Sequence, residues 1–421
     1  MNLSKSKRMI VLLLLSLIAG LVYLTPFLRF SFYDQMKTAL GLTDVQMGVI
    51  GGTYGALNVL SYIPSGFLTE RFNTKRLLLI SMLGMLACTL WYATYPPFAA
   101  LVVIHALYGV FSVGTFWCPY LKAIRNLASE ESQGTIFGLS EGLRGVGQTA
   151  VAFLCLTSLQ FFVQVAAGFR AVILINAGAF ALLFVATLLL VPDFDRRVGE
   201  QGKQESVKET LANMFRCLKD PGIWICIFVI MCGYALWNTV NGYIGTYTTR
   251  VLHLPPSVSS VLSILRSYII VFVAGTTGGF LLDRFRFKGT GMRLFYLCCL
   301  LITAGTFFTE RMVFLCAVFT ILAGYFVNVI KSTYWSILGS AGIPPEATGR
   351  ATGIISLIAL TPDIFVPPVI SQFLDWGERT GSIEQGFHLM LAWMAVWSIL
   401  GIAAASLLKR RQTALSGTAK E

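Results

Sequence analysis

Seven ionisable side chains interrupt sequence runs that are otherwise apolar, and their types point to ion chemistry in a low-dielectric medium. An ionised group surrounded by hydrocarbon is costly, so each should face protein or a water-filled cavity. Guanidinium and ammonium groups bind carboxylate, phosphate or sulfonate groups, whereas a sequestered carboxylate can carry a proton or act as a counter-ion. Basic groups outnumber acidic ones, so a shared cavity would be positive and would favour an anionic solute. The seven are Arg29, Lys122, Glu141, Arg144, Arg266, Lys331 and Asp363.

The basic members of this set differ in depth. Arg29, Arg266 and Lys331 lie far from the polar ends of their apolar runs, and we expect each to bind substrate. Lys122 is nearer to an end. Its position is as consistent with snorkelling towards the membrane surface as with binding substrate.

Each acidic member has two interpretations. Glu141 and Arg144 stand three residues apart on one helical face, which fits a local ion pair as well as a gating role. Asp363 follows Thr361 and Pro362. It is either a counter-ion to a basic residue, Lys331 or Arg266, or a proton carrier.

Polar and aromatic side chains also gather in the seventh apolar run. Trp237, Asn238 and Asn241 occupy neighbouring helical positions, where a tryptophan and two amides could bind a hydroxylated or ring-bearing solute. Hydrogen bonding between helices is the alternative. The same two interpretations apply to Tyr54, Asn58, Tyr62, Trp117, Asn328 and Trp335.

Other kinds of chemistry lack the residues they need. His105, His253 and His388 are isolated, and the nine cysteines show no C-x-x-C spacing, so no metal site, catalytic set or cofactor is predicted. The sequence has no G-x-x-x-x-G-K-[ST] motif, which argues against an ATP-driven pump. We therefore expect neither enzyme activity nor a cofactor.

The composition identifies the medium that surrounds these residues. Hydrophobic residues make up 56% of the 421, charged residues 12%, and the mean hydropathy is +0.72. A soluble domain carries about 25% charged residues. Apolar runs near the roughly 20 residues that cross a bilayer predict an all-α membrane protein of about twelve transmembrane helices. The predicted spans are 9–36, 44–68, 76–95, 99–124, 134–163, 171–191, 223–248, 257–281, 292–309, 312–337, 350–374 and 387–408.

The basic residues predict the orientation of these spans. Of the 32 lysines and arginines, 22 fall in the joints on the side of the N-terminus and five in the opposite joints. By the positive-inside rule, both termini are cytoplasmic. The net charge of +12 therefore follows topology, and no nucleic-acid partner is expected.

A long polar joint, 192–221, divides the chain into two six-span halves, 1–191 and 222–421. A surface helix is predicted within it, around Ser206–Lys219. Ser65–Phe72 is similar to Gly278–Phe285 at an offset of 213 residues, and both follow the second span of their half. Repeats of this kind build several transporter folds and place the substrate at the interface between the repeats.

A glycine, an acid and basic residues mark the joint that follows the second span in each half. The glycine would let two helices approach closely, and the acid can face a helix N-terminus or a basic partner. The basic side chains would stay at the cytoplasmic interface. The residues are Gly66, Glu70, Arg71, Lys75 and Arg76, and then Gly279, Asp283 and Arg284.

This pattern resembles the loop signature of the major facilitator superfamily, with Glu70 in place of the commoner aspartate. Trp117–Gly147 resembles the fourth and fifth spans of that superfamily, and the resemblance covers essentially the whole chain. It implies two six-helix bundles related by pseudo-two-fold symmetry, with the third and sixth spans of each half at the periphery. The seven charged residues avoid those spans. The loop residues would form a conformational latch and would not bind substrate.

Arg29 is similar in position to the first-span arginine of the organophosphate–phosphate antiporters. The seventh span, Gly233–Asn241, lacks the partner arginine of that group, which argues against a simple two-arginine phosphate clamp.

Together these observations predict a monomeric secondary active transporter of the cell inner membrane. It would move a small anionic solute by alternating access, coupled to a proton or to a counter-transported anion, with membrane lipid as its other partner. The alternative is a proton-coupled carrier of a neutral polyol, nucleoside or drug, in which Asp363 or Glu141 titrates. A membrane-embedded sensor or enzyme is a further class for which we find no supporting residues.

Overall fold

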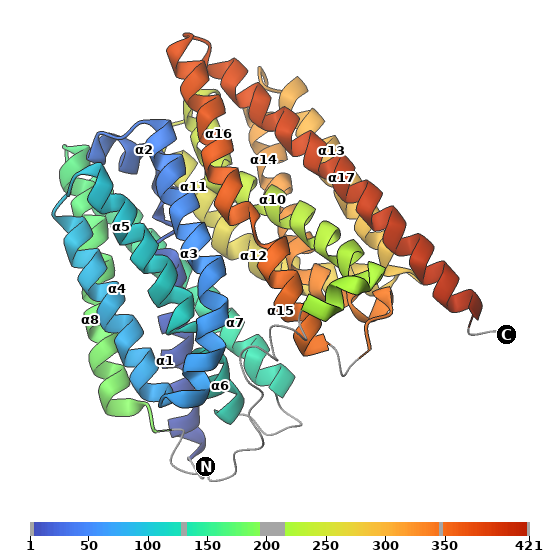
Figure 1. Ribbon diagram of the computed structural model, residues 1–421. Coiled ribbons are helices and arrows are strands. Elements are labelled where there is room, and N and C mark those ends of the chain that lie inside the picture. The colour runs from blue at the N-terminus through green and yellow to red at the C-terminus, as the bar shows by residue number, and fades with distance from the viewer. Residues whose placement is uncertain (1–3, 128–132, 194–214, 345–347, 419–421) are drawn as a thin grey trace. The chain divides into compact units, whose positions relative to one another are not determined.

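A computed structural model describes residues 4–127, 133–193, 215–344 and 348–418 (Figure 1). These residues form helices joined by turns, with no strand among them. The chain divides into two compact units, Met1–Gln204 and Glu205–Glu421. The predicted helix around Ser206–Lys219 lies mostly outside the described residues, which show helix at 215–216 and a 3-10 turn at Cys217–Lys219.

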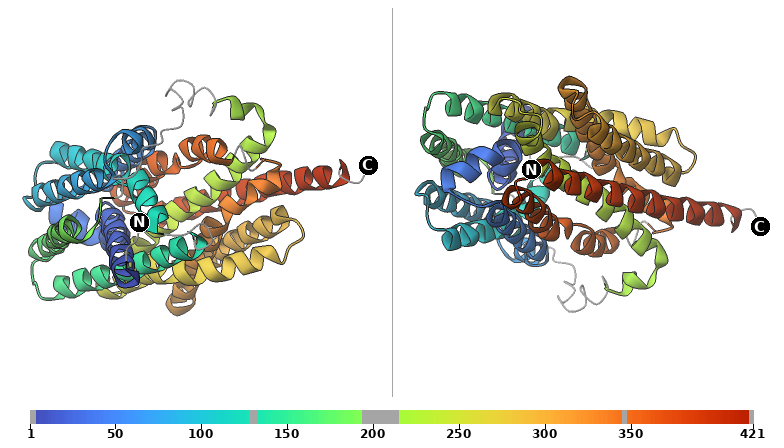
Figure 2. Two further views of the ribbon diagram at one scale, coloured as in Figure 1. Left: turned by 90° about the horizontal axis from the view of Figure 1, so that it is seen from below. Right: turned by 90° about the horizontal axis from the view of Figure 1, so that it is seen from above.

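The first unit holds the six spans expected in the N-terminal half. Within it, α1 packs on α7, α3 on α5, and α4 on α8 (Figures 1 and 2). A π-helical turn, Val110–Gly114, follows α5. The helices are α1 (Lys5–Leu24), α2 (Leu28–Leu40), α3 (Asp44–Arg71), α4 (Thr74–Ala93), α5 (Phe98–Gly109), α6 (Trp117–Leu127), α7 (Gln133–Gln160) and α8 (Val165–Leu190).

The second unit repeats this packing. Its α10 packs on α16, α12 on α14, and α13 on α17, and these helices stand at the same places in the second half of the sequence. A π-helical turn, Leu265–Ile269, joins α11 to α12. The helices are α10 (Pro221–Arg250), α11 (Pro256–Ile264), α12 (Ile270–Asp283), α13 (Lys288–Phe308), α14 (Val313–Thr333), α15 (Thr348–Ala359), α16 (Pro362–Arg379) and α17 (Ile383–Thr418).

The prediction of an all-α protein with about twelve spans is confirmed. Among the described residues, 10 helical segments are long and apolar enough to cross a bilayer. The helices α3 and α7 occupy the remaining two predicted positions, 44–68 and 134–163, but fall below that level of hydropathy.

Four predicted spans contain a break or a π-helical turn. The span predicted at 9–36 breaks between Leu24 and Leu28, and the span predicted at 350–374 breaks between Ala359 and Pro362. Pro26 and Pro362 account for these breaks, because proline has no N–H to donate and its ring clashes with the preceding turn. The spans predicted at 99–124 and 257–281 contain the two π-helical turns.

These irregularities fall beside the intramembrane charges. Arg29 is the second residue of α2 and Asp363 is the second residue of α16, so each directly follows a break. Arg266 lies inside the π-helical turn Leu265–Ile269. Single π-helical turns within longer helices are frequent at functional sites.

A glycine allows α3 and α5 to touch. A Cβ atom added at Gly109 would lie 2.8 Å from both the Tyr54 carbonyl oxygen and the Asn58 amide nitrogen. Both neighbours are backbone atoms, so neither can move aside by changing a rotamer. The close packing of α3 on α5 therefore requires glycine at this position.

We expect Gly109→Ala to destabilise the protein by about 1–3 kcal/mol, because the added methyl group overpacks a backbone contact. The measurement is the midpoint of thermal unfolding in detergent. Gly178→Ala in α8 is the matched control, since a Cβ there meets nothing within 4 Å. Equal midpoints for the two variants would contradict the predicted contact.

Candidate functional site

The interior of the second unit holds an aromatic platform that carries a lysine. The rings of Tyr234 and Trp237 on α10 stack with centroids 5.3 Å apart and an interplanar angle of 18°. The Nζ atom of Lys331, on α14, lies 3.1 Å from the Trp237 ring centroid and 5.7 Å from that of Tyr234. The ring quadrupole attracts an ammonium group placed over its face, so this contact stabilises a charge inside the bundle.

The aspartate of α16 joins the same cluster. The Tyr234 hydroxyl donates to Asp363 Oδ2 at 2.7 Å, and the Asn238 amide donates to Asp363 Oδ1 at 2.6 Å. Asp363 is 5% exposed and Asn238 is fully buried. Both donors are neutral, and hydrogen bonds to an ionised acceptor are about twice as strong as neutral ones. Tyr234 therefore belongs to both parts of the cluster, through its ring and through its hydroxyl.

Hydrogen bonds between helices fix the polar residues of α10. Trp237 Nε1 donates to Asn328 Oδ1 on α14 at 3.0 Å. Ser267 Oγ, in the π-helical turn, donates to Asn241 Oδ1 at 3.0 Å. Asn238 bonds to Asp363 on α16. Trp237, Asn238 and Asn241 therefore all take part in hydrogen bonds between helices, which was the alternative to binding a solute.

Part of the cluster is accessible, and we call this part, Trp237 and Lys331, its edge. Trp237 and Lys331 are half-buried, whereas Tyr234, Asn238, Asn241 and Asp363 are buried. A solute that reaches the cluster would therefore meet the ammonium group and the indole ring first.

Arg266 is fully buried and stands apart from the platform. Its Nη2 donates to Ser263 Oγ at 2.8 Å and its Nη1 to Thr320 Oγ1 at 3.4 Å. A bond of 3.3 Å from Asn328 Nδ2 to the Arg266 carbonyl oxygen connects it to the cluster through the backbone.

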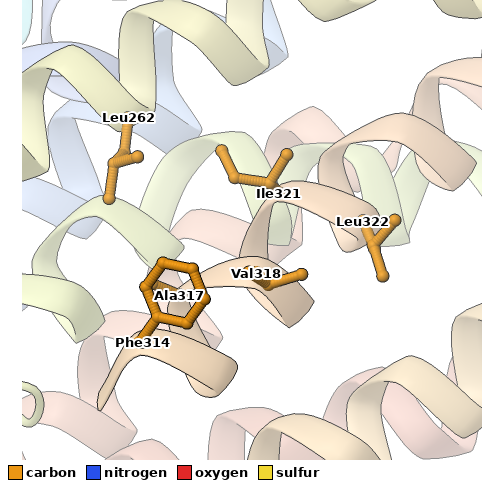
Figure 3. Close-up of a pocket in the computed structure, with 6 residues that line it drawn as sticks. All are labelled: Leu262, Phe314, Ala317, Val318, Ile321 and Leu322. Carbon is orange, nitrogen blue, oxygen red and sulfur yellow. The ribbon is translucent and has the colours of Figure 1, made fainter.

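A carbon-lined groove of about 240 Å³ lies between α11 and α14 (Figure 3). Leu262 is adjacent in sequence to Ser263, and Ala317 and Ile321 flank Thr320 on α14. The groove is thus lined by residues that are near Ser263 and Thr320 in the sequence. The lining residues are Leu262, Phe314, Ala317, Val318, Ile321 and Leu322.

In the first unit, Arg29 lies among aromatic rings. It is 3% exposed, and its guanidinium carbon is 4.8 Å from the Phe30 ring centroid and 5.9 Å from that of Phe27. Phe27 meets Tyr54 edge-on at 5.0 Å, and Asn58 Nδ2 donates to the Tyr54 hydroxyl at 3.0 Å. The structure therefore brings Arg29 close to two of the polar residues that the sequence left ambiguous.

The other intramembrane charges of this unit make local contacts. Lys122 Nζ donates to the Thr69 carbonyl oxygen at 3.3 Å, in the last turn of α3, where a cation favours the helix dipole. Arg144 Nη2 and Glu141 Oε2 form an ion pair of 2.7 Å, which is one of the two interpretations that their spacing left open. Lys122 thus lies beside the first loop motif.

The loop motif has the same geometry in both halves. The Arg71 guanidinium lies 4.0 Å from the Phe67 ring centroid, and that of Arg284 lies 4.3 Å from the Phe280 ring centroid. Lys75 Nζ donates to the Leu188 carbonyl oxygen at 2.9 Å. The side chains of Glu70, Arg76 and Asp283 are exposed.

The close helix packing that we expect at Gly66 and Gly279 is not seen among the described residues. A Cβ atom at either position meets nothing within 4 Å. At the neighbouring Gly278, a Cβ atom would lie 3.1 Å from Val329 Cγ1, so this glycine provides the contact between α12 and α14.

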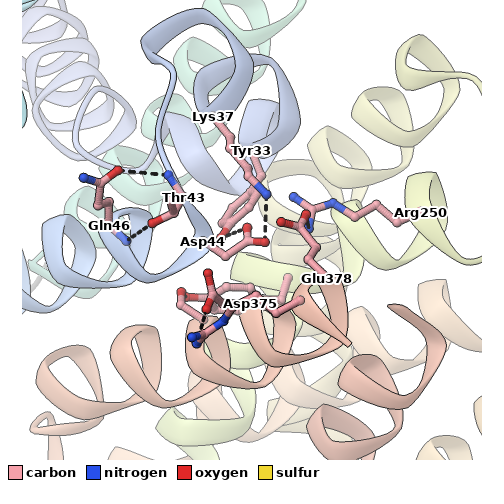
Figure 4. A network of polar contacts seen from close by, with 11 residues as sticks. Tyr33, Lys37, Thr43, Asp44, Gln46, Arg250, Asp375 and Glu378 are labelled. Atoms are coloured by element: carbon pink, nitrogen blue, oxygen red, sulfur yellow. Dashed lines mark hydrogen bonds and ion pairs between the residues drawn. The ribbon is translucent and has the colours of Figure 1, made fainter. Parts of the chain in front are cut away.

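Polar contacts also anchor helix ends in each unit (Figure 4). In the first unit, the fully buried Asp44 accepts from the Tyr33 hydroxyl at 2.8 Å and from Lys37 Nζ at 2.9 Å. In the second unit, Arg250 and Glu378 form an ion pair of 2.9 Å between the ends of α10 and α16.

Residues 12–367 match the sequence profile of the Major Facilitator Superfamily. Two Escherichia coli proteins of strain K12 are similar to this chain along nearly their whole length. The inner membrane protein YqcE is 24% identical over 98% of this chain and 97% of its own length. The inner membrane protein YihN is 24% identical over 94% of both chains.

Solved transporter structures share the fold at low sequence identity. A bacterial homologue of the human lysosomal transporter Spinster, in an inward-facing unoccupied conformation, superposes with a TM-score of 0.78 at 14% identity, over 97% of this chain and 98% of that one. The nucleoside transporter NupG gives 0.74 at 14% identity, over 96% and 99%. A D-xylose–proton symporter gives 0.72 at 13% identity, over 94% and 96%.

The shared role of Tyr234 predicts a measurable loss of stability. Tyr234→Phe removes a donor from a buried carboxylate, and we expect a cost of about 1–3 kcal/mol. Tyr325→Phe is the control, because the Tyr325 hydroxyl is hydrogen-bonded only to the neutral Thr277 hydroxyl, at 2.8 Å. Thermal unfolding of both variants tests this, and a smaller loss for Tyr234→Phe than for Tyr325→Phe would contradict it.

Proposed function

Because this chain belongs to the major facilitator superfamily, we propose that it is a secondary transporter whose second unit binds an organic anion at Lys331. Its fold is that of multi-pass membrane transporters, and its relatives are inner membrane proteins. The observation that carries the proposal is the position of the Lys331 ammonium over the Trp237–Tyr234 stack.

This arrangement suits an anionic ligand. The ring faces stabilise the positive charge of the ammonium group at the half-buried edge of the cluster. This charge attracts a carboxylate, phosphate or sulfonate that approaches the edge, while the indole ring supports the apolar part of the solute. The first unit has a buried cation of its own, Arg29, held beside the Phe27 and Phe30 rings.

Asp363 is the group that we propose couples transport to protons. Its donors, Tyr234 and Asn238, can serve both of its protonation states. An amide can present N–H to an ionised carboxylate or, after rotation, its oxygen to a protonated one. Asn238 Oδ1 is buried and has no hydrogen-bond partner, so an acceptor stands ready beside Asp363.

The mechanism we propose is alternating access between two repeated halves, with both termini in the cytoplasm. The paired contacts Arg71–Phe67 and Arg284–Phe280 support a common role for the two loop motifs as a conformational latch.

A second candidate function is proton-coupled transport of a neutral, ring-bearing solute. The stacked Tyr234 and Trp237 rings favour it, since a planar solute can stack on the same faces. Lys331 and Arg29 would then serve only as internal counter-ions.

A ligand screen separates the two candidates. We expect organic carboxylates, phosphates or sulfonates to raise the unfolding temperature of the purified protein, and Lys331→Met to abolish that rise. Lys409→Met, which removes one positive charge from α17, is the control that should keep it. Arg29→Ala tests the contribution of the first unit. If only neutral sugars or nucleosides raise the unfolding temperature, the anion hypothesis is wrong.

Asp363→Asn tests the coupling. In proteoliposomes, we expect the variant to lose accumulation of the screened anion driven by a proton gradient while retaining exchange, because an amide cannot titrate. Asp375→Asn is the control, since Asp375 pairs with Arg379 at the end of α16. Proton-driven accumulation that survives in Asp363→Asn would exclude Asp363 as the coupling residue.

A further inference from the structure

Arg266 carries a charge that no described residue of the second unit neutralises. Its side chain is 0% exposed, and none of the described carboxylates forms an ion pair with it. An arginine side chain stays protonated in proteins, so it cannot lose its charge by titration. A buried charge without compensation is strongly destabilising, and the fold must supply an opposite charge.

The hydrogen bonds of the guanidinium group are incomplete. Of its five N–H donors, one reaches Ser263 Oγ and one reaches Thr320 Oγ1, the latter at 3.4 Å. Its Nε atom is buried and has no hydrogen-bond partner. The two hydroxyls direct their own protons to the carbonyl oxygens of Ser259 and Ala317.

A second orphaned donor lies on the same helix face. Ser259 is one turn before Ser263, is 3% exposed, and its hydroxyl has no hydrogen-bond partner. Gly324 holds the arginine in place from α14, because a Cβ atom there would lie 2.8 Å from Arg266 Cγ. The region between α11 and α14 is therefore rich in donors and poor in acceptors.

The groove on this side of the bundle offers no compensation. The six residues that line it are apolar (Figure 3), so the groove presents no charged group and no side-chain acceptor. A transported organic solute would also have to reach a side chain that is completely enclosed. The missing acceptor must be small.

We propose that Arg266 binds a small monovalent anion of the halide type, held between α11 and α14 and distinct from the transported solute. One negative charge neutralises one guanidinium. A spherical ion accepts bonds from N–H and O–H donors in several directions, which matches the remaining donors of Arg266 and Ser259. This inference does not depend on the proposed function, because it assigns the ion a structural role.

The anion would also support the substrate cluster. Asn328 donates to the carbonyl oxygen of Arg266 at 3.3 Å and accepts from Trp237 Nε1 at 3.0 Å. An ion that fixes Arg266 in the π-helical turn therefore fixes the position of Asn328, and through it the indole ring of Trp237.

The test is a chloride titration of the purified full chain without substrate. Sodium chloride replaces sodium gluconate at constant ionic strength while thermal unfolding is followed. We expect a saturable rise in unfolding temperature for the native protein and none for Arg266→Met. Because Arg266→Met could fail to fold, Ser259→Ala is the second variant, and we expect its chloride affinity to be about tenfold weaker from the loss of one bond to a charged group.

Ser332→Ala is the matched control and should titrate like the native protein, since its hydroxyl bonds to backbone carbonyls of α12 and α14. Crystals grown in bromide should show an anomalous peak within hydrogen-bonding distance of the Arg266 guanidinium group. A native unfolding temperature that does not respond to chloride, an unchanged affinity in Ser259→Ala, or bromide located only elsewhere would each overturn the proposal.

Discussion

The cost of placing an ionised group in an apolar medium governs the arrangement of this protein. Several kinds of partner stabilise the charged groups inside the helix bundles. Ring faces surround Lys331 and Arg29, neutral hydroxyl and amide donors hold Asp363, and the last turn of α3 receives Lys122. Arg266 has two hydroxyl groups as hydrogen-bond acceptors, and its buried Nε atom has no hydrogen-bond partner. Because the partners differ, replacing one of these charged residues leaves a different group without its partner at each position.

Much of the fold could be predicted from the sequence, because crossing a bilayer requires apolar runs of known length. The positions of the charges within those runs were also visible. The helix breaks near Arg29 and Asp363 could have been predicted from Pro26 and Pro362. The π-helical turn at Arg266 could not, since a single inserted residue leaves no mark in composition. The proline-free run around it is indistinguishable from a regular helix.

The candidate site was only partly accessible to sequence reasoning. Trp237, Asn238, Lys331 and Asp363 were identified by type, but their partners come from three separate helices and depend on tertiary packing. Tyr234, which links the platform to Asp363, was missed as an individual residue. Its spacing of three and four residues from Trp237 and Asn238 was the signal that could have found it. The repeat, by contrast, is visible in both sequence and structure. In each loop motif an arginine lies over the ring of a phenylalanine four residues before it.

The modest hydropathy of α3 and α7 has a consequence for biosynthesis. Segments enter the bilayer from the translocon according to their apolarity, and α3 and α7 are less apolar than the ten other predicted spans. These two helices are therefore the least able to insert without a packing partner. Their packing partners differ in order of synthesis: α7 follows α1, whereas α3 precedes α5. As it emerges from the ribosome, α7 can therefore join a helix that is already inserted. In contrast, α3 must wait at the translocon, or beside α1, until α5 arrives to cover its glycine- and polar-rich face.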